Sequence, residues 1–535
     1  MKVKTIIKTG QLFMMAVLLA ACANEDIAQD KKKENGTEAP KGGVVFATND
    51  TKISAKRRFI DEDEFAGAKT RTDIKHTPGQ GAEAYWTSDD FIWVKKQDGN
   101  WVQSTSTTLH DGGASAEFTL PGSKSDYTDG CEVRYTGTSR TKFGAFNVPG
   151  GVGIHAYQNR TTPNDFSNAG EWGDCGSGKA QSTGNPAKFN FTLAHKASYL
   201  CFLPRCENTT LAPNIRLKGI KITATNEMRF ADLCMFDGEE LTAPGSPFGW
   251  DFINVDLPDF KIDTKANQAL NAVYMVVRPG TYNFKIEYTI EDPTTNVVGT
   301  ITDVRTGITL AKDNFYDVTA NLVPSEDYNP KYYMWDAVTD YWDGVSLPNV
   351  LTNGYTNSDY PQSGQPRYYN DFALFPTEAS RSCAICPNTN ELLWYAQQGD
   401  PKWDTSTLWS MRGHLYKGGL WLLHRTNIPN FSSTIAPDGV TDYTKAGAPL
   451  VWYERQLTPS VPAKSEQHKY FFLPSTGYIL DGQLHKVGDY ADFWARTPSI
   501  HGAPIVGTHI LFPSGKLTVA DGCPRQYGFT IKAFD

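Results

Sequence analysis

The sequence has little positive charge, few long apolar runs and little helical periodicity. Its 535 residues carry a formal net charge of −8. Because nucleic-acid binding relies on concentrated Lys and Arg, no nucleic-acid partner is expected. The apolar stretch 12–21 is too short to cross a bilayer as a helix, which needs about 20 residues, and no other stretch is apolar enough. The sequence therefore gives no reason to expect a helical bundle or a basic nucleic-acid-binding surface.

Catalytic signatures are also missing. The 10 histidines are scattered, and neither His-Glu-x-x-His nor Gly-x-Ser-x-Gly occurs. Carboxylates are so common that no pair can be singled out for glycoside hydrolysis. We interpret His195 as a buried side chain with a hydrogen-bonded ring rather than as a catalytic base. No enzymatic activity, cofactor or metal is therefore expected.

Residues 173–179 come close to a phosphate-binding loop. That motif requires Ser or Thr after its lysine, and here Ala180 follows Lys179. It also requires a strand before the loop and a helix after it, whereas Gly and Pro occupy both flanks here. We interpret these residues as a surface loop.

Aromatic residues, glycine and proline are abundant. The chain contains 13 Trp, 25 Tyr and 28 Phe, together with 46 Gly and 31 Pro. Aromatic side chains favour strands and Gly and Pro mark turns, so this mixture predicts a mainly β protein. The chain is too long for one hydrophobic core, and two or more domains are expected.

Strand and turn patterns define two regions after residue 42, namely 43–190 and 191–324. In the first region, strands are expected at 44–46 and at 116–120, where apolar and polar residues alternate. The strand patterns of the second region are at 191–200, 215–223, 272–278, 282–290 and 314–322. Short strands at this spacing predict Greek-key β-sandwich domains.

A connector, 325–370, leads to a third region, 371–535. The aromatic residues at 332–335 indicate that the connector is packed against the protein. Within 387–399 the third region has the one convincing helix pattern, with a capping-type start, an apolar face and Gly399 to end it. Strand patterns follow at 420–423, 470–474, 508–512, 515–519 and 527–533. The third region is therefore predicted to be α+β.

The first residues are typical of a secretory signal. Lys2, Lys4 and Lys8 precede the apolar stretch 12–21, which ends in Leu-Ala-Ala before Cys22. This ending resembles the lipobox of bacterial lipoproteins, which implies a signal peptide over 1–21 and a lipid on Cys22. Residues 22–42 are expected to form a flexible tether. Its acidic start at 23–26 resembles a surface-export tag of some Gram-negative bacteria.

Residues 43–324 resemble the fimbrillin family, the subunits of donor-strand-assembled pili of Gram-negative bacteria. The resemblance rests on the lipobox and tether, on the 44–46 strand followed by 70–72 and 86–92, and on the stretches 191–200 and 314–322. It implies that a trypsin-like protease cuts after an arginine behind the first strand, so that a strand of a neighbouring subunit fills the vacated groove. The candidate arginines are Arg57, Arg58 and Arg71.

The third region resembles a C-type-lectin-like module. The similar segments are 386–395, 470–477, 487–490, 493–494, 511–515 and 525–529. Residues 495–498 replace the usual serine-rich run. The Glu-Pro-Asn, Gln-Pro-Asp and Trp-Asn-Asp triplets of calcium-dependent sugar binders are absent. The resemblance therefore implies the fold and not calcium-dependent sugar binding.

Nine cysteines leave several pairings open once Cys22 is assigned to the lipid. Cys383 and Cys386 have the spacing of a redox pair or of half a zinc site, but no second spaced pair would complete a zinc site. The order of motifs in the lectin-like module favours a structural disulfide between Cys386 and Cys523, with one cysteine left over.

Aromatic residues of the third region are candidates for stacking on sugars or a protein partner, and core packing is the alternative for each. They are Trp403, Trp409, Trp421, Tyr490, Phe493 and Trp494.

The resemblance also implies a place in the fibre. In the family the donated strand is a C-terminal extension, whereas here the chain continues after Leu322 into a further folded region. A segment tied into a domain cannot easily lie extended in a neighbour's groove. We therefore predict a tip adhesin that accepts a strand from another pilus subunit, donates none, and presents the third region to a surface glycan or protein. Its precursor would be an outer-membrane lipoprotein. The alternatives are a lipid-anchored carbohydrate-binding or pilus-assembly protein and, less favoured, a surface glycosidase.

Overall fold

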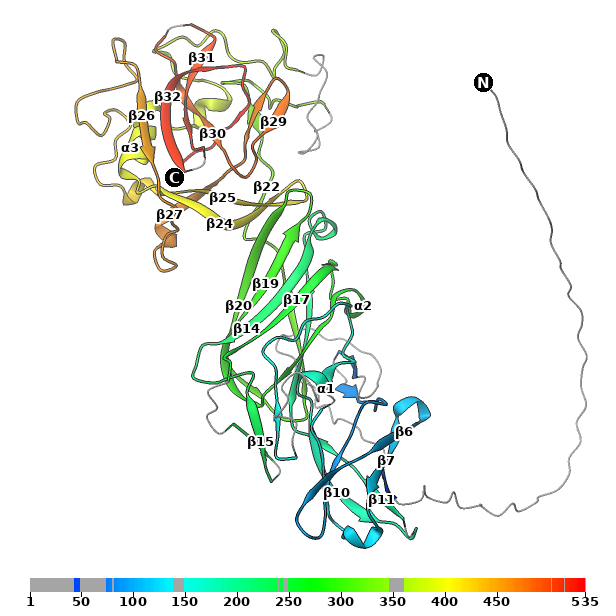
Figure 1. Ribbon diagram of the computed structural model, residues 1–535. Helices are drawn as coiled ribbons and strands as arrows, with labels where there is room; N and C mark the ends of the chain where they lie inside the picture. The colour runs from blue at the N-terminus through cyan, green and yellow to red at the C-terminus, as the bar shows by residue number, and fades with distance from the viewer. Residues whose placement is uncertain are drawn as a thin grey trace, which may run out of the picture. The chain divides into compact units, whose positions relative to one another are not determined.

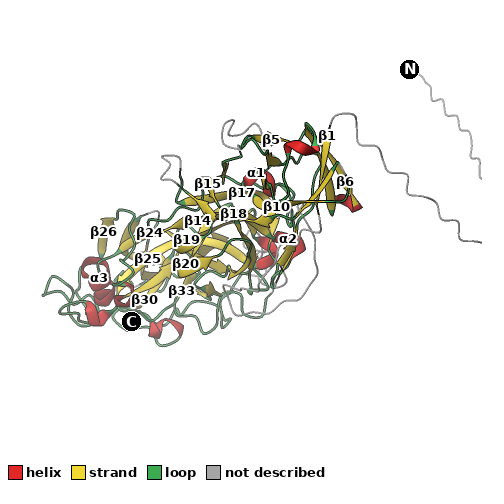
Figure 2. Ribbon diagram, turned by 90° about the horizontal axis from the view of Figure 1, so that it is seen from below, coloured by secondary structure: helices red, strands yellow, loops and turns green. Residues whose placement is uncertain are grey.

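The protein is mainly β (Figures 1 and 2). The computed structural model describes residues 43–48, 74–78, 81–137, 149–185, 187–238, 240–243, 249–345, 360–501, 503–513 and 515–534. The chain divides into two compact units, Met1–Lys41 and Gly42–Asp535, and all of the described residues belong to the second. Cys22, Arg57, Arg58 and Arg71 lie outside the described residues. In the described part of the chain, no helix has the length and apolar character needed to cross a membrane.

The first region forms one nine-stranded sheet, with the strand order β5-β4-β8-β10-β11-β1-β7-β6 and with β12 paired to β10. The strands are β1 (Gly43–Thr48), β4 (Trp93–Lys95), β5 (Trp101–Gln103), β6 (Ser106–His110), β7 (Ser115–Pro121), β8 (Glu132–Tyr135), β10 (Gly176–Ser182), β11 (Lys188–Phe191) and β12 (Ala194–His195). Side chains from both halves of the sheet, such as Phe118 and Val133, share one core, so the sheet must curve around it. The predicted strands at 44–46 and 116–120 are confirmed, and β7 alternates buried and half-buried residues as a half-buried strand should.

The second region packs a three-stranded sheet, β18-β13-β21, and a four-stranded sheet, β17-β14-β19-β20, around a common core. Their strands are β13 (Ser198–Arg205), β14 (Arg216–Ala224), β17 (Phe252–Lys261), β18 (Val273–Val277), β19 (Gly280–Asp292), β20 (Val297–Leu310) and β21 (Phe315–Asn321). Short helices α1 (Ala169–Trp172) and α2 (Gln268–Asn271) and two small sheets accompany them. The small sheets contain β2 (Lys75–Thr77) and β3 (Gly81–Glu83), and β9 (Gly151–Gly153), β15 (Leu233–Asp237) and β16 (Glu240–Thr242). The strands predicted from 215 onward are all present.

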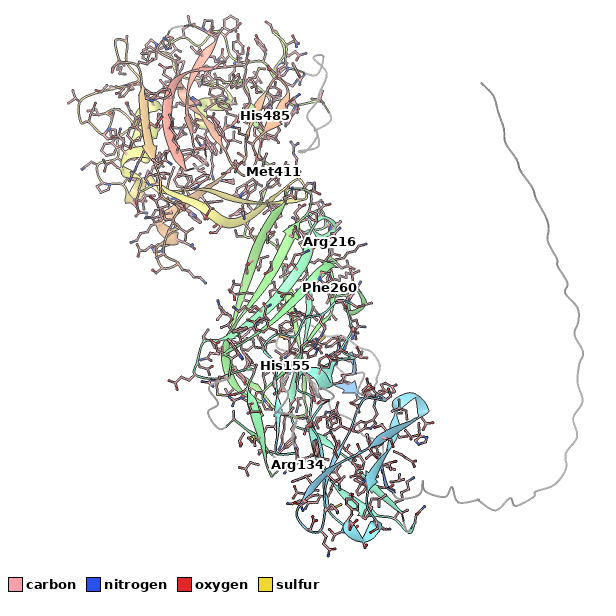
Figure 3. The ribbon with its side chains drawn as sticks, in the orientation of Figure 1. Arg134, His155, Arg216, Phe260, Met411 and His485 are labelled. Carbon is pink, nitrogen blue, oxygen red and sulfur yellow. The ribbon has the colours of Figure 1, made fainter. Side chains whose placement is uncertain are left out.

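Part of the predicted first region packs with the second. Strand β9 pairs with β15, and Val152 and Ile154 lie in the core of the second region. His155 places its ring 5.6 Å from that of Trp172 (Figure 3). The sequence did not indicate this, because nothing in the short, glycine-rich stretch around residue 152 shows which sheet it joins.

The third region contains two main sheets, β22-β24-β25-β27 and β23-β33-β30-β31-β32-β26, and one long helix. The elements are β22 (Asp327–Tyr328), β23 (Tyr332–Tyr333), α3 (Thr389–Gln398), β24 (Lys402–Met411), β25 (His414–Leu423), β26 (Trp452–Gln456), β27 (Tyr470–Pro474), β28 (Tyr478–Leu480), β29 (Gln483–His485), β30 (Asp492–Pro498), β31 (Val506–Leu511), β32 (Lys516–Pro524) and β33 (Phe529–Thr530). Short 3₁₀ helices in the chain cover Asp111–Gly113, Lys124–Asp126, Ala212–Asn214, Ser382–Ile385, Arg425–Asn427 and Gln467–Lys469. The described parts of the connector, 325–345 and 360–370, are packed, as predicted: β22 and β23 join these sheets, and Tyr332 and Trp335 are buried.

Helix α3 begins and ends where the sequence predicts. The side chain of Asn388 accepts a hydrogen bond from the Glu391 N–H at 2.9 Å, and Glu391 Oε2 accepts one from the Asn388 N–H at 2.8 Å. This reciprocal capping box satisfies two backbone donors that the helix itself cannot. The Gly399 N–H donates to Tyr395 O and ends the helix, whose Leu392 and Tyr395 face the core.

The second and third regions are joined by specific hydrogen bonds. The turn between β24 and β25 meets the turn that follows β19, where Asp292 Oδ2 accepts hydrogen bonds from the Leu415 N–H at 2.9 Å and from His414 Nδ1 at 3.0 Å. Asn214 Nδ2 donates to Gly413 O at 2.7 Å. Met411, at the end of β24, is fully buried (Figure 3). The segment that leads from β21 into the third region therefore has folded structure on both sides.

Candidate functional site

Strand β1 is held between two strands that come from distant parts of the chain. It pairs antiparallel with β7, from Gly43 opposite Pro121 to Ala47 opposite Glu117. On its other side it pairs parallel with β11, where Val45 lies opposite Lys188. Every other strand of this sheet follows residue 92 in the sequence. If the chain were cut between β1 and residue 92, β1 could therefore be removed while the remaining strands stayed covalently connected to one another.

The side chains of β1 fill part of the first core. Val44 and Phe46 are 1% and 0% exposed. The Phe46 ring stacks on Phe189, with a centroid distance of 4.8 Å, and meets the edge of Tyr127 at 5.3 Å. Burying Phe46 alone contributes roughly 2–3 kcal/mol. Removing β1 would leave an apolar slot flanked by two unpaired backbone edges, which is the arrangement that β-augmentation fills.

The outer face of β1 is crossed by an ion pair between its two neighbours. Lys188 Nζ of β11 lies 2.6 Å from Glu117 Oε1 of β7. The hydrogen bond from Lys188 lowers the pKa of Glu117. At the end of β1, Thr48 Oγ1 accepts a hydrogen bond from the Ala116 N–H at 2.9 Å. Polar contacts thus border the apolar slot on the outside.

A buried carboxyl lies in the same region. Asp90 accepts hydrogen bonds from Tyr135 Oη at 2.8 Å and from the Thr87 N–H at 2.7 Å. Burial raises its pKa to about 6, against the lowering effect of these bonds. This group makes the first region sensitive to pH.

Four of the six candidate aromatic residues are core residues, as in the packing alternative. Trp403, Trp409, Phe493 and Trp494 are 7%, 0%, 4% and 0% exposed. Two of the three buried indoles are hydrogen-bonded: Trp409 Nε1 donates to Gly418 O and Trp494 Nε1 to Tyr333 O. These residues stabilise the third region and offer no face to a ligand.

Trp421 and Tyr490 are half-buried and keep part of their surface open. Trp421 donates from Nε1 to Asp404 Oδ2 at 2.9 Å and packs against Phe472 at 4.9 Å. Tyr490 packs against Tyr478 at 4.9 Å. Both stay candidates for ligand contact.

The sequence analysis missed two more exposed aromatic residues in the described part of the third region. Phe372 is 83% exposed and Trp452 is 67% exposed. Trp452 lies on β26, at the edge of the six-stranded sheet. Large exposed apolar side chains mark interaction surfaces more often than average surface residues do. No motif distinguishes these two in the sequence from the buried aromatic residues nearby.

The eight cysteines of the described part of the chain are free thiols and are buried. Cys386 and Cys523 lie in one cluster with Cys383, but no disulfide joins them. Cys386 follows the short helix Ser382–Ile385, and its N–H bonds to Cys383 O, so its thiol neighbour is Cys383 rather than Cys523. The predicted Cys386–Cys523 disulfide is therefore not formed in this structure and stays a prediction.

His195 has the hydrogen-bonded, buried ring that the sequence analysis proposed. Its Nδ1 lies 2.8 Å from Asp174 Oδ1, which also accepts a hydrogen bond from Tyr199 Oη at 2.5 Å. Burial lowers the pKa of His195, but the Asp174 carboxylate raises it by more, so the net shift is upward. The His195 ring on β12 and the Tyr199 hydroxyl on β13 thus meet at one carboxylate, which links the nine-stranded sheet to the three-stranded sheet of the second region.

Residues 173–179 are a helix end followed by a strand, so their interpretation as a surface loop was wrong. Gly173, with φ at 116°, ends α1, and β10 begins at Gly176. A Cβ on Gly178 would lie 2.0 Å from Thr192 O. The glycines therefore permit close packing of backbone on backbone, and the helix-then-strand order is the reverse of a phosphate-binding loop.

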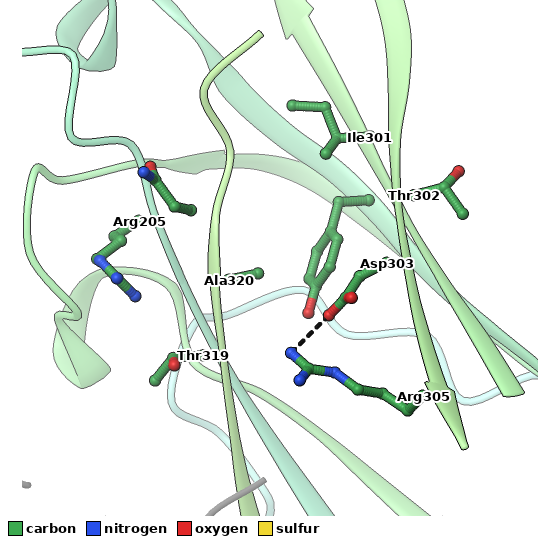
Figure 4. Close-up of a pocket in the computed structure, with 9 residues that line it drawn as sticks. Arg205, Ile301, Thr302, Asp303, Arg305, Thr319 and Ala320 are labelled. Atoms are coloured by element: carbon green, nitrogen blue, oxygen red, sulfur yellow. Dashed lines mark ion pairs between the residues drawn. The ribbon is translucent and has the colours of Figure 1, made fainter. Parts of the chain in front are cut away.

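A cavity of about 380 Å³ lies between the two sheets of the second region, beside edge strands β20 and β21 (Figure 4). Its lining residues are Arg205, Tyr288, Ile301, Thr302, Asp303, Arg305, Thr319, Ala320 and Asn321. Arg305 Nη2 pairs with Asp303 Oδ2 at 2.7 Å. Polar and apolar side chains both line the cavity, and no sequence motif indicated it.

Comparison with known proteins gives similarity of structure only. No protein-family model matches the chain, and no curated protein matches it. A fimbrial protein of Bacteroides ovatus is similar over 92% of this chain and 99% of its own, with 10% identity and a TM-score of 0.26. A fimbrial assembly protein of Parabacteroides distasonis is similar over 52% of this chain and 90% of its own, with 9% identity and a TM-score of 0.27. These values are too low to establish membership of a family.

Proposed function

We propose that this chain is a subunit of a donor-strand-assembled surface pilus, and that its first region accepts a strand from a neighbouring subunit in place of β1. The observation that carries the proposal is the position of β1, which is paired on both sides and buries Val44 and Phe46. The three candidate cleavage residues, Arg57, Arg58 and Arg71, all lie in sequence between β1 and β2.

A strand-replacement assay tests this function. The purified chain is treated with a trypsin-like protease, and a labelled peptide of residues 41–50 is added in excess. The peptide is expected to compete with the cleaved β1 and to bind stably, because it restores both sets of backbone hydrogen bonds and refills the slot left by Phe46. A peptide with Phe46→Asp is the matched control and is expected not to bind. Equal binding of the two peptides, or none, would contradict the proposal.

Processing and lipid attachment form a second part of the proposal. Cys22 carries the lipid of an outer-membrane precursor, and cleavage after one of the arginines releases the subunit from it. Cys22→Ala should abolish labelling by a fatty-acid probe. N-terminal sequencing of surface protein should find residue 58, 59 or 72 first, and single Arg→Ala variants identify which. Surface protein that still begins at Cys22 refutes cleavage.

The strand order at the end of the second region supports the proposed position at the fibre tip. Strand β21 pairs with β13, and the chain then enters β22, which pairs with β24 of the third region. The described segment that follows β21 is thus held in folded structure and is not free to be donated as a strand. The third region would form a lectin-like head for a surface glycan or protein, with Trp421 and Tyr490 as contact candidates. Antibody to residues 371–535 should label fibre ends in immunogold electron microscopy. Label along the whole shaft would overturn this placement.

A lipid-anchored carbohydrate-binding or pilus-assembly protein is the second candidate. It is favoured by the well-packed β1, which an uncleaved, anchored chain would keep. Cell fractionation separates the two functions, because a tip subunit occurs in sheared pili and an anchored protein stays with the membrane.

A further inference from the structure

Three residues that the sequence analysis did not connect, His76, Cys201 and Asp317, meet on the outer face of the β18-β13-β21 sheet. Cys201 of β13 lies in register with Asp317 of β21 on one side and with Tyr274 of β18 on the other. His76, on the short strand β2, covers this row. Two of these contacts join segments more than a hundred residues apart, so the fold alone brings the groups together.

The geometry of the group is that of a ligand set. His76, Cys201 and Asp317 are 5%, 0% and 4% exposed, and their ligand atoms all lie within 4.8 Å of one another. His76 Nε2 is 2.6 Å from Asp317 Oδ1. An imidazole, a thiol and a carboxylate therefore converge on one point that is closed to solvent.

Surrounding contacts hold His76 and the neighbouring Tyr274 in place. The His76 ring stacks on Phe315 with a centroid distance of 4.6 Å and an interplanar angle of 8°. Gln268 Nε2 donates to His76 O and, at 2.9 Å, to Tyr274 Oη, and Tyr274 donates to Asn164 Oδ1 at 2.7 Å. Metal ligands held in this way by neighbouring hydrogen bonds and packing need little rearrangement to bind.

We propose that His76, Cys201 and Asp317 bind a zinc ion. One nitrogen, one sulfur and one oxygen ligand form a set that suits Zn²⁺, with a fourth position left for water. In a tetrahedral zinc site the nitrogen and oxygen ligands are about 3.3 Å apart, so His76 and Asp317 must separate by about 0.7 Å from their hydrogen-bonded distance. The ion takes the place of the proton between His76 Nε2 and Asp317 Oδ1. That proton moves to His76 Nδ1 or to solvent, so that His76 binds as a neutral imidazole.

Zinc also changes the state of the thiol. Without a metal, Cys201 is a free, buried thiol. Binding forms the sulfur–zinc bond and releases the thiol proton to solvent, which makes the affinity rise with pH. The same ion would fasten β2 to the second region. Because His76 follows Arg71 by five residues, it would hold the new N-terminal segment if cleavage occurs there, and this consequence alone rests on the proposed function.

Cobalt substitution of the uncleaved chain tests the site directly. The chain is expressed without its signal peptide, stripped with a chelator and titrated with Co²⁺. A near-ultraviolet sulfur-to-cobalt absorption band should appear and saturate at one ion per chain, and Zn²⁺ should abolish it. Cys201→Ser should remove the band and His76→Gln should weaken binding at least tenfold. Cys206→Ser, at a buried thiol just beyond β13, is the matched control and should keep the band.

Two results would overturn the site. One is a folded wild-type chain that shows no sulfur-to-cobalt band. The other is a band that persists in Cys201→Ser and disappears in Cys206→Ser or in Cys383→Ser. Either result would leave His76–Asp317 as a hydrogen-bonded pair only. Because no protease or pilus is involved, the outcome is independent of the strand-replacement assay.

Discussion

The first and second regions each contain a strand that runs parallel to its neighbour, but the two strands are held differently. Strand β1 lies between β7 and β11. Its C-terminal end is connected to the other strands of the sheet through the segment that contains the candidate arginines. Strand β21 lies at a sheet edge and pairs with β13 alone. Just after it, the Leu322 N–H donates to Arg205 O at 2.7 Å, and the chain continues into β22.

This difference means that the first region, but not the second, has a strand that one cut in the chain could make replaceable. More contacts hold β1, but a single cut in the chain makes it a separate peptide. Fewer strands hold β21, but its covalent connections on both sides prevent it from leaving. In the proposed strand exchange, chain connectivity rather than the number of hydrogen bonds would decide which strand can be replaced.

The largest expected effect comes from Phe46→Ala. It should lower the free energy of unfolding of the first region by about 3–5 kcal/mol, because it empties a fully buried site. Val318→Ala on β21 should cost the second region about 2 kcal/mol. Chemical denaturation followed by hydrogen exchange of each region measures both. After cleavage and replacement of β1 by a wild-type peptide, the Phe46→Ala effect should vanish while the Val318→Ala effect persists. If both persist, β1 is not exchanged.

A change of pH should alter the first region through Asp90. The folded carboxyl has a pKa of about 6 and the unfolded one about 3.8, so between these values the folded state binds more protons. Stability from this group therefore rises as pH falls from about 7 to 4, by roughly 2–3 kcal/mol. In Asp90→Asn this part of the pH dependence should be missing. Denaturation midpoints of both proteins at several pH values provide the measurement, and parallel curves would exclude the assignment.

Asn388→Ala tests whether the third region is stable independently of the other two. Loss of the α3 cap, and of the bond from Asn388 Nδ2 to Ser433 O, should destabilise the third region by about 1–2 kcal/mol. Asn168→Ala is the control, because Asn168 precedes α1 without a side-chain capping bond. Hydrogen exchange should show the change in residues 389–398 and leave β1 unaffected. Equal deprotection of the first region would show that the regions unfold together.

The smallest effect is expected from Lys188→Ala. The pair with Glu117 crosses β1, but both side chains are about one-third exposed, so its loss should cost less than about 1 kcal/mol. The effect should shrink further in high salt. Lys95→Ala, which removes a similar pair with Glu132 away from β1, is the matched control. A cost well above that of the control would mean that the pair helps to retain β1.

The sequence predicts elements better than it predicts contacts. The strand at 44–46 and the capped helix after Asn388 were found because alternation and capping are local patterns. It could not show that β9 joins the second region, or that His76, Cys201 and Asp317 meet, because these contacts depend on the register of distant strands. For the same reason, nothing near Trp452 and Trp494 indicated which would be exposed.

The mixed pairing of β1 has a consequence for the polarity of any segment that replaces it. Because β7 and β11 run in opposite directions on its two sides, an incoming strand of either orientation is antiparallel to one neighbour and parallel to the other. Backbone hydrogen bonding therefore discriminates little between the two orientations. The choice falls to side chains: a large ring must reach the Phe189 and Tyr127 site, and a smaller apolar residue must enter two positions away. The slot left by β1 would therefore select a strand by the spacing and size of its apolar residues rather than by its chain direction.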